Sequence, residues 1–320
     1  MALILVTGGA GFIGSHVAAA LLTNGHDVRV VDNLSTGVAE NLPLDADFID
    51  GDLTDVSVAA AAVRGCELVL HQAAVPSVPR SISHPRPSHE SNIDATFNVL
   101  TAARDAGVRR VVYAASSSAY GDSAVLPKVE DMPVNPRSPY ALQKYVGEAY
   151  CRLFAELYGL ETVSLRYFNV FGPRQHPTSA YSGVLSLFIK AALSGAAPTI
   201  YGDGEQTRDF TYIDNVVDAV LRAVWAPGVS GEVINVAAGG RISLNEAWAT
   251  LQRIVGPLPA PVYAPARAGD VRDSQADISK AERLLGYRPT VSFESGLQRT
   301  VDWARESFGP APAAVECTVE

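Results

Sequence analysis

The chain has 320 residues, of which 48% are hydrophobic and 18% are charged, and its net charge is −9. This length exceeds the usual size of a single domain, so we expect one large domain with a smaller satellite, or two domains. The acidic balance argues against nucleic acid as the main partner, although a local arginine cluster would still attract a small anion.

The first predicted element is an apolar strand over residues 3–6 that runs into a glycine cluster. Gly8 permits a sharp turn, Gly11 leaves room for a pyrophosphate against the main chain, and Gly14 lets the next helix pack on the strand. That helix ends at Asn24, and its N-terminus offers N–H groups to phosphates. An ordinary glycine loop is the alternative, but the context favours a dinucleotide-binding turn.

The second predicted strand, residues 27–31, ends in Asp32. This carboxylate stands roughly 20 residues after the glycine turn, where a ribose 2′-hydroxyl would lie. The alternative is a turn cap formed with Asn33. A 2′-phosphate would be repelled by Asp32, and residues 33–37 contain no arginine to compensate. The pattern therefore favours NAD over NADP.

Apolar strands continue to alternate with helical patterns through the first half of the chain. We expect strands at 47–49, 68–70, 110–114 and 162–166, and helices at 56–63, 92–106 and 138–158. This alternation predicts an α/β fold, with a Rossmann-type, doubly wound parallel sheet covered on both faces.

Beyond Asn169 proline and glycine become frequent, and only a helix at 214–224 and a strand at 233–236 return to the earlier rhythm. We expect two further helices between Ser243 and Phe308. The predicted division is a NAD-binding Rossmann domain at 1–170, rejoined by about 214–237, a smaller C-terminal α/β substrate-binding region at 171–213 and 238–308, and a disordered tail at 309–320.

Residues 138–144 combine a helix start with two side chains of chemical interest. Ser138 is a good N-cap and Pro139 a good first helical residue. Tyr140 and Lys144 lie four residues apart, so they share one helix face. A free tyrosine, with a pKa of about 10, is a poor base at neutral pH, but an adjacent ammonium and a cationic nicotinamide ring favour its phenolate. The alternative is an ordinary aromatic residue beside a solvated lysine.

A run of hydroxyls follows the predicted strand at 110–114. Ser116, Ser117 and Ser118 stand at the carboxyl end of that strand, where ligands bind in open α/β sheets. Three hydroxyls there can pass or hold a proton, while simple turn chemistry is the alternative.

Targeting and metal-binding signals are weak in this sequence. Its three cysteines, Cys66, Cys151 and Cys317, are far apart and show no metal-ligand spacing, so we expect reduced structural thiols and no metal. The N-terminus begins directly with a strand, and no apolar run reaches transmembrane length. We expect a cytoplasmic protein without a membrane anchor.

Several motifs together resemble the extended short-chain dehydrogenase/reductases. They are the glycine turn at 8–14, Asp52-Leu53, His71-Gln72-Ala73-Ala74, the serine run, and Tyr140 with Lys144. Within that family the chain looks like the nucleotide-sugar 4-epimerases, the UDP-galactose 4-epimerase group. Residues 166–173 and 202–210 match that group's substrate-side motifs, and the similarity covers about residues 2–303.

The resemblance implies a set of site residues. The catalytic residues would be Ser116, Tyr140 and Lys144. The residues that contact NAD would be Gly8, Gly11, Phe12, Ile13, Gly14, Asp32, Asn33, Asp52, Leu53, Gln72, Ala73, Ala74, Asn92, Tyr140, Lys144 and Tyr167. The residues that contact the UDP-sugar would be Ser77, Ser116, Ser117, Ser118, Tyr140, Asn169, Val184, Tyr201, Arg208, Arg267, Asp270 and Ser274.

The resemblance also implies the division of labour among these residues. Tyr140 would take the proton from the sugar O4 while C4 loses a hydride to NAD, and the 4-keto sugar would turn over before the hydride returns. Asn169, Asp270 and two arginines would hold the UDP end, with Tyr201 against the uracil. Surface ion pairing is the alternative for the two arginines, Arg208 and Arg267.

The sugar is predicted from Ser274. UDP-glucose-restricted relatives have a tyrosine at this place, whereas a serine leaves room for a 2-acetamido group. Other segments also look like the subgroup that prefers N-acetylated UDP-hexoses, so we expect UDP-N-acetylglucosamine and UDP-N-acetylgalactosamine. UDP-glucose/UDP-galactose and UDP-glucuronate remain alternatives, the last because Arg80 or Arg208 could meet a C6 carboxylate.

Other functions fit the residues less well. A 4,6-dehydratase would carry an acidic pair at Ser117 and Ser118, and Asp32 disfavours a reductase that releases NADP. A catalytically dead nucleotide sensor would lack Tyr140 or Lys144. The helices at 92–106 and 138–158 could pair with a second copy as a four-helix bundle, as in relatives, so we expect a homodimer.

Overall fold

The computed structural model describes residues 2–175, 183–266 and 271–309. A seven-stranded parallel sheet lies at its centre, in the order β11-β6-β5-β4-β1-β2-β3. Its strands are β1 (Leu3–Thr7), β2 (Asp27–Asp32), β3 (Asp47–Asp50), β4 (Leu68–His71), β5 (Arg110–Ser116), β6 (Glu161–Tyr167) and β11 (Glu232–Val236). Because the order runs outward from β1 in both directions, the predicted doubly wound sheet is confirmed.

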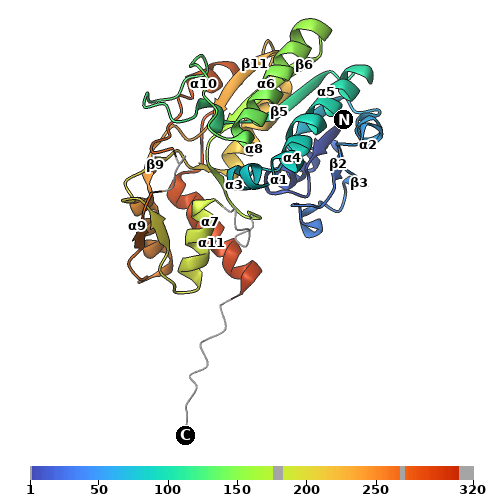
Figure 1. Ribbon diagram of the computed structural model, residues 1–320. Coiled ribbons are helices and arrows are strands. Elements are labelled where there is room, and N and C mark those ends of the chain that lie inside the picture. The colour runs from blue at the N-terminus through green and yellow to red at the C-terminus, as the bar shows by residue number, and fades with distance from the viewer. Residues whose placement is uncertain (1, 176–182, 267–270, 310–320) are drawn as a thin grey trace.

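Helices cover both faces of the sheet because successive strand residues point to opposite sides. In β1, Ile4 and Val6 belong to the core beneath α1 (Phe12–Thr23) and α8 (Ile213–Trp225), whereas Leu5 belongs to the core beneath the other layer. That layer consists of α2 (Val56–Val63), α5 (Ala95–Asp105) and α6 (Pro139–Tyr158). Figure 1 shows α5 and α6 packed side by side across the sheet.

Between β4 and α5 the chain forms short helical turns. These are α3 (Val78–Ser83), α4 (Pro85–His89) and a π-helical turn, η2 (Glu90–Asp94). The helix expected from about Asn92 therefore becomes a regular α-helix only at Ala95. Asn92 is buried, with its amide hydrogen-bonded to Val75 and Gln143, and the wider π turn accommodates this inward side chain.

A smaller C-terminal region adjoins the carboxyl ends of the strands. Its elements are β7 (Val170–Phe171), α7 (Val184–Leu193), β8 (Thr199–Tyr201), β9 (Thr207–Arg208), β10 (Thr211–Tyr212), β12 (Ile242–Ser243), α9 (Leu244–Val255), β13 (Val262–Ala264) and α11 (Phe293–Phe308). The helix α10 (Ser279–Leu285) packs instead against α8 and β11. In Figure 1, α7, α9 and α11 form a separate group below the sheet. The proposed domain boundaries remain a prediction.

The expectation of two helices after Ser243 was wrong, because the described residues there form three: α9, α10 and α11. The extra helix, α10, has seven residues, too few to show clear periodicity. It is held by burial of Ala281 and Leu285 against α8 and β11.

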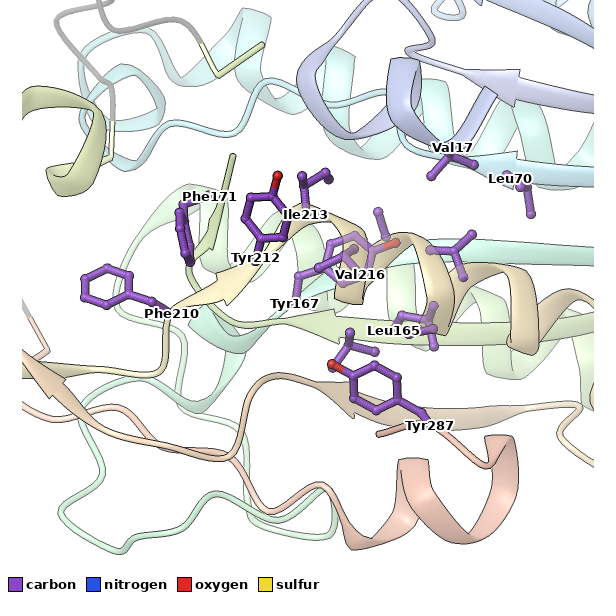
Figure 2. Packing of buried hydrophobic residues seen from close by; sticks show 14 of the residues in the cluster. Val17, Leu70, Leu165, Tyr167, Phe171, Phe210, Tyr212, Ile213, Val216 and Tyr287 are labelled. Carbon is purple, nitrogen blue, oxygen red and sulfur yellow. The ribbon is translucent and has the colours of Figure 1, made fainter. Parts of the chain in front are cut away.

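An aromatic cluster joins the smaller region to the end of β6. Phe171 makes edge-to-face contacts with Phe210 and Tyr212, with ring centroids 6.3 and 5.6 Å apart. Figure 2 shows these rings in the same buried cluster as Ile213 and Tyr167, the last residue of β6. The cluster fixes the substrate-side segments relative to the sheet edge where ligands are expected.

Three further sequence predictions concern membrane spans, the cysteines and the C-terminal tail. None of the helices in the described ranges combines the length and apolar character needed to cross a bilayer. Cys66 and Cys151 are buried free thiols, whereas Cys317 lies outside the described residues. The expected tail at 309–320 also lies outside them, apart from Gly309.

Candidate active site

The glycine turn after β1 has no room for side chains. Gly8 has a φ of +67°, and a Cβ there would lie 2.7 Å from the Ala73 Cα. A Cβ on Gly14 would lie 2.1 Å from the Gly8 carbonyl oxygen, so the first turn of α1 packs directly on the loop. Gly11 is the residue before α1 and has no side chain to cover its helix N-terminus. This bare backbone fits a pyrophosphate.

The tips of β2 and β3 carry the carboxylates predicted to meet the adenosine. Asp32 accepts hydrogen bonds from the backbone N–H groups of Ala10 (3.0 Å) and Leu34 (2.9 Å). The Asn33 side chain donates to Asp52 at 2.8 Å and so ties the two tips together. The donors around Asp32 are neutral, so its charge would still disfavour a 2′-phosphate.

An unpartnered amide lies at the carboxyl end of β4. Gln72 Oε1 accepts a hydrogen bond from the Tyr167 hydroxyl at 3.2 Å. Gln72 Nε2 is buried and has no hydrogen-bond partner among the described residues. A buried donor left without a partner costs about 1–3 kcal/mol, so this amide fits a polar ligand such as the cofactor. The residues present therefore fit a dinucleotide at the predicted place.

His71 was not predicted as a site residue, yet it organises this edge of the sheet. Thr96 Oγ1 donates to the Asn92 carbonyl, so it must accept from His71 Nε2, 2.9 Å away. His71 Nδ1 then accepts from Thr7 Oγ1 at 2.7 Å, and Thr7 in turn accepts from the Ala73 N–H. This chain of bonds holds a neutral imidazole and fixes the loop that follows β4.

Two other predicted ligands act within the same loop. Asn92 Oδ1 accepts from the Val75 N–H at 2.7 Å, and its Nδ2 donates to Gln143 at 2.8 Å. Ser77 caps α3 by accepting from the Arg80 N–H at 3.1 Å. Both side chains shape the segment after β4, and their direct contact with a ligand remains a prediction.

Ser116, Tyr140 and Lys144 come together where β5 ends beside the start of α6. Ser138 caps α6 by accepting from the Ala141 N–H at 3.2 Å, and the Tyr140 N–H donates to Ser81 at 3.1 Å. Burial raises the pKa of the Tyr140 phenol, and a hydrogen bond with the Ser116 side chain opposes this effect. Without bound ligand, Tyr140 is thus neutral at neutral pH.

Lys144 lies deeper than the sequence suggests. It is 4% exposed, and its Nζ lies 4.7 Å from the ring centre of Tyr113. Burial lowers the pKa of Lys144 to about 7, so the ammonium that should favour the Tyr140 phenolate is only partly charged at neutral pH. Tyr113 was missed because it stands within an apolar strand and carries no motif signal. Its hydroxyl donates to the Lys144 carbonyl at 3.3 Å.

The substrate-side residues gather around β9. Arg208 Nη1 donates to the carbonyls of Thr207 (2.8 Å) and Arg272 (2.9 Å). The Ser274 N–H donates to the same Thr207 carbonyl at 3.1 Å, which places Ser274 beside Arg208. Two further predicted ligands, Arg267 and Asp270, lie outside the described residues.

Asp209, which was not predicted, fixes this group to the sheet. Its carboxylate accepts from the backbone N–H groups of Ala238, Gly239 and Ala276, at 3.0 to 3.1 Å. Asn169, with a φ of +33°, donates to the Asp209 carbonyl at 3.4 Å.

The remaining predicted substrate ligands lie in the same region or beside the catalytic residues. Val184 begins α7, and Tyr201 ends β8, where its carbonyl accepts from Gln206. Ser117 and Ser118 lie in the short turn η3 (Ser117–Tyr120) that follows Ser116.

The sequence model of the NAD dependent epimerase/dehydratase family matches residues 4–237. The chain belongs to this family. A putative UDP-glucose 4-epimerase of Methanocaldococcus jannaschii is 40% identical over 308 residues, covering 95% of this chain and 99% of that protein. A UDP-glucose 4-epimerase of Mycolicibacterium smegmatis is 40% identical over 312 residues, covering 94% of this chain and 98% of that protein.

Solved structures agree with this assignment. The UDP-glucose 4-epimerase of Thermotoga maritima, with UDP-glucose, has a TM-score of 0.93 at 40% identity and covers 96% of this chain and 99% of its own. The UDP-N-acetylglucosamine 4-epimerase of Methanobrevibacter ruminantium has a TM-score of 0.91 at 37% identity, covering 95% and 98%. The Thermus thermophilus UDP-glucose 4-epimerase complex with NAD has a TM-score of 0.88 at 37% identity, covering 95% and 99%. The predicted family and its NAD dependence are confirmed.

Proposed function

We propose that this protein interconverts the C4 epimers of a UDP-hexose. The observation that carries the proposal is the contact between the Ser116 hydroxyl and the Tyr140 phenol at the carboxyl end of β5, with Lys144 one helical turn away. The site that fits a dinucleotide lies along the same sheet edge. Of the two relatives at 40% identity, one is named UDP-glucose 4-epimerase and the other putative UDP-glucose 4-epimerase.

The chemistry assigned to the protein's own residues is proton transfer at the sugar O4. When bound, NAD supplies a hydride acceptor and donor for C4. Tyr140 takes the O4 proton and later returns it, while the Ser116 hydroxyl donates a hydrogen bond to the phenolate. Because burial raises the pKa of Tyr140 and lowers that of Lys144, positive charge brought in by the cofactor is needed to favour the phenolate.

The relatives favour UDP-glucose and UDP-galactose as the substrate pair, rather than the N-acetylated sugars expected from the sequence. Ser274 still supports N-acetylated UDP-hexoses as a second pair, since its small side chain stands beside Arg208. A similar solved structure is named UDP-N-acetylglucosamine 4-epimerase. We therefore propose activity on the plain sugars, with a site that also admits the acetamido group.

Two measurements test this proposal. Turnover of UDP-galactose in D₂O should give UDP-glucose without deuterium at C4 or C5, because the hydride returns within the site. Deuterium at C5 with a 4-keto-6-deoxy product would instead show a dehydratase. For the sugar, Ser274→Tyr should abolish turnover of N-acetylated substrates and retain that of UDP-galactose, and an unchanged ratio of kcat/KM would contradict the role of Ser274.

We also propose that the protein is a homodimer through α5 and α6. Exposed apolar side chains on these helices lie on their outward faces: Phe97 is 42% exposed, Leu153 42% and Leu157 67%. Phe97 also packs on Tyr150 across the two helices, with ring centroids 5.2 Å apart. A second copy would cover this face as a four-helix bundle. Light scattering should give twice the chain mass, and Leu153→Glu should give monomers.

A further inference from the structure

Ser118 makes two hydrogen bonds to the hydroxyl oxygen of Ser116. The Ser118 Oγ lies 2.8 Å from the Ser116 Oγ, and the Ser118 backbone N–H donates to the same atom at 3.2 Å. All three serines of the run are half-buried. Ser116 Oγ also contacts the phenol of Tyr140, so this one oxygen joins Ser118 to the proposed base.

The proton positions in this group follow from the chemistry of Tyr140. A phenolate only accepts hydrogen bonds, so Ser116 must donate its single proton to Tyr140 when Tyr140 is the base. The Ser116 oxygen then has only acceptor sites left, and the Ser118 hydroxyl must be the donor across the 2.8 Å contact. Two donors from Ser118 therefore occupy the acceptor sites of Ser116 and leave its proton free for Tyr140.

We propose that Ser118 is a positioning residue that orients the Ser116 hydroxyl toward Tyr140, the proposed base. This inference rests on the proposed function of Tyr140. Without the Ser118 hydroxyl, the Ser116 oxygen loses one of its two donors. The Ser116 O–H is then less polarised and is a weaker hydrogen-bond donor to the phenolate. The phenolate then loses part of its stabilisation, and the pKa of Tyr140 rises.

The side chain of Ser118 can be removed without removing the turn. Ser118→Ala and Ser118→Gly keep the backbone N–H that bonds to Ser116 Oγ, so the cap of η3 is retained. Ser118→Thr keeps the hydroxyl as well and is the conservative control. Far-ultraviolet circular dichroism and NAD content establish that each holoenzyme is folded.

The first measurement titrates Tyr140 without any substrate. The tyrosinate absorbance of each holoenzyme is recorded against pH, and the titration of the same protein with Tyr140→Phe is subtracted. We expect the midpoint to rise by about one pH unit in Ser118→Ala and Ser118→Gly, the scale of a weakened hydrogen bond to a charged group. Ser118→Thr should keep the wild-type midpoint. A midpoint unchanged by loss of the hydroxyl would overturn the proposal.

The second measurement uses epimerase kinetics. In Ser118→Ala the acid limb of the kcat profile should move up by the same amount, with kcat at neutral pH about tenfold lower. The double variant Ser116→Ala/Ser118→Ala should be no slower than Ser116→Ala alone, because Ser118 acts only through Ser116. A clearly slower double variant would contradict the inference. Normal turnover by Tyr140→Phe would refute the proposed function of Tyr140. The titration would still decide separately whether Ser118 acts on Tyr140, because it uses no substrate.

Discussion

Glu148 and Arg166 form a buried ion pair that joins α6 to β6. Glu148 Oε2 accepts from Arg166 Nε at 2.8 Å and Oε1 from Nη2 at 2.7 Å, and the two side chains are 6% and 3% exposed. The guanidinium also lies 4.6 Å from the ring centre of Tyr120. Glu148 stands one turn beyond Lys144, so the pair holds the catalytic helix against the strand that ends in Tyr167.

Breaking this pair should destabilise the protein. Arg166→Met leaves the Glu148 carboxylate buried without a partner, and we expect the free energy of unfolding to fall by about 3–5 kcal/mol. Arg166→Met with Glu148→Leu should recover much of that loss, because no charge then remains buried. The measurement is urea unfolding. The control is Arg86→Met, which breaks an exposed pair with Glu90 and should cost less than about 1 kcal/mol. If Arg166→Met lost no more unfolding free energy than this control, the stabilising role of the buried pair would be contradicted.

Cofactor retention tests the glycine turn. Denatured wild-type protein should release about one NAD per chain and no NADP, since the hydride returns to the same sugar and Asp32 disfavours a 2′-phosphate. In Gly14→Ala the new Cβ would meet the Gly8 carbonyl at 2.1 Å, so purified variant should carry much less NAD. Gly240→Ala has no heavy atom within 4 Å of its Cβ and should keep the wild-type NAD content. Equal NAD content in the two variants would argue against pyrophosphate binding at this turn.

Loss of the proposed base should separate binding from turnover. Tyr140→Phe keeps the ring and removes the hydroxyl, so UDP-sugar affinity should be largely kept while kcat falls by at least ~10²-fold. The measurements are calorimetric binding of UDP and steady-state epimerisation. Tyr263→Phe removes a hydroxyl from an exposed tyrosine of β13 and should leave kcat unchanged. The proposed mechanism fails if Tyr140→Phe turns over at the rate of this control.

The sequence predicted the parts of this molecule that depend on local pattern. The apolar strands, the glycine turn and the capped start of α6 follow from periodicity and from Ser138, Pro139 and the glycines, and the sheet order agrees with them. Contacts between distant segments leave no such local trace. The burial of Lys144 against Tyr113 is one such contact. Another is the set of hydrogen bonds that the Asp209 carboxylate accepts from three backbone N–H groups.

Burial also reverses one sequence-based argument about the site. The spacing of Tyr140 and Lys144 predicts two neighbours on a helix face but does not show whether that face is exposed to solvent or buried. Burial raises the pKa of the phenol and lowers that of the amine, so proximity alone does not activate Tyr140. The bond of Ser118 to Ser116 was likewise hidden, because three consecutive serines look equivalent in the sequence.

His71 should make stability fall in acid. Burial, with a smaller contribution from Lys144, lowers the pKa of His71 from 6.5 to about 3. Between these values the unfolded chain binds a proton that the folded protein does not, so folding stability is present above pH 6.5 and is lost as pH falls, by up to ~1.4 kcal/mol per pH unit. Urea unfolding at about pH 5 and pH 6.5 should show a smaller difference in His71→Gln than in wild type. Parallel pH dependences would contradict a neutral, buried imidazole.

Nuclear magnetic resonance of UDP-sugars incubated with the purified holoenzyme tests the central claim most directly. UDP-glucose, UDP-N-acetylglucosamine and UDP-glucuronate are supplied separately, with no added cofactor and with NADH absorbance recorded in parallel. We expect UDP-galactose to form from UDP-glucose, with no net NADH, and UDP-N-acetylgalactosamine to form from its N-acetylated epimer. A 4-keto-6-deoxy product, net NADH formation, or no reaction with any of the three sugars would contradict the proposed 4-epimerase.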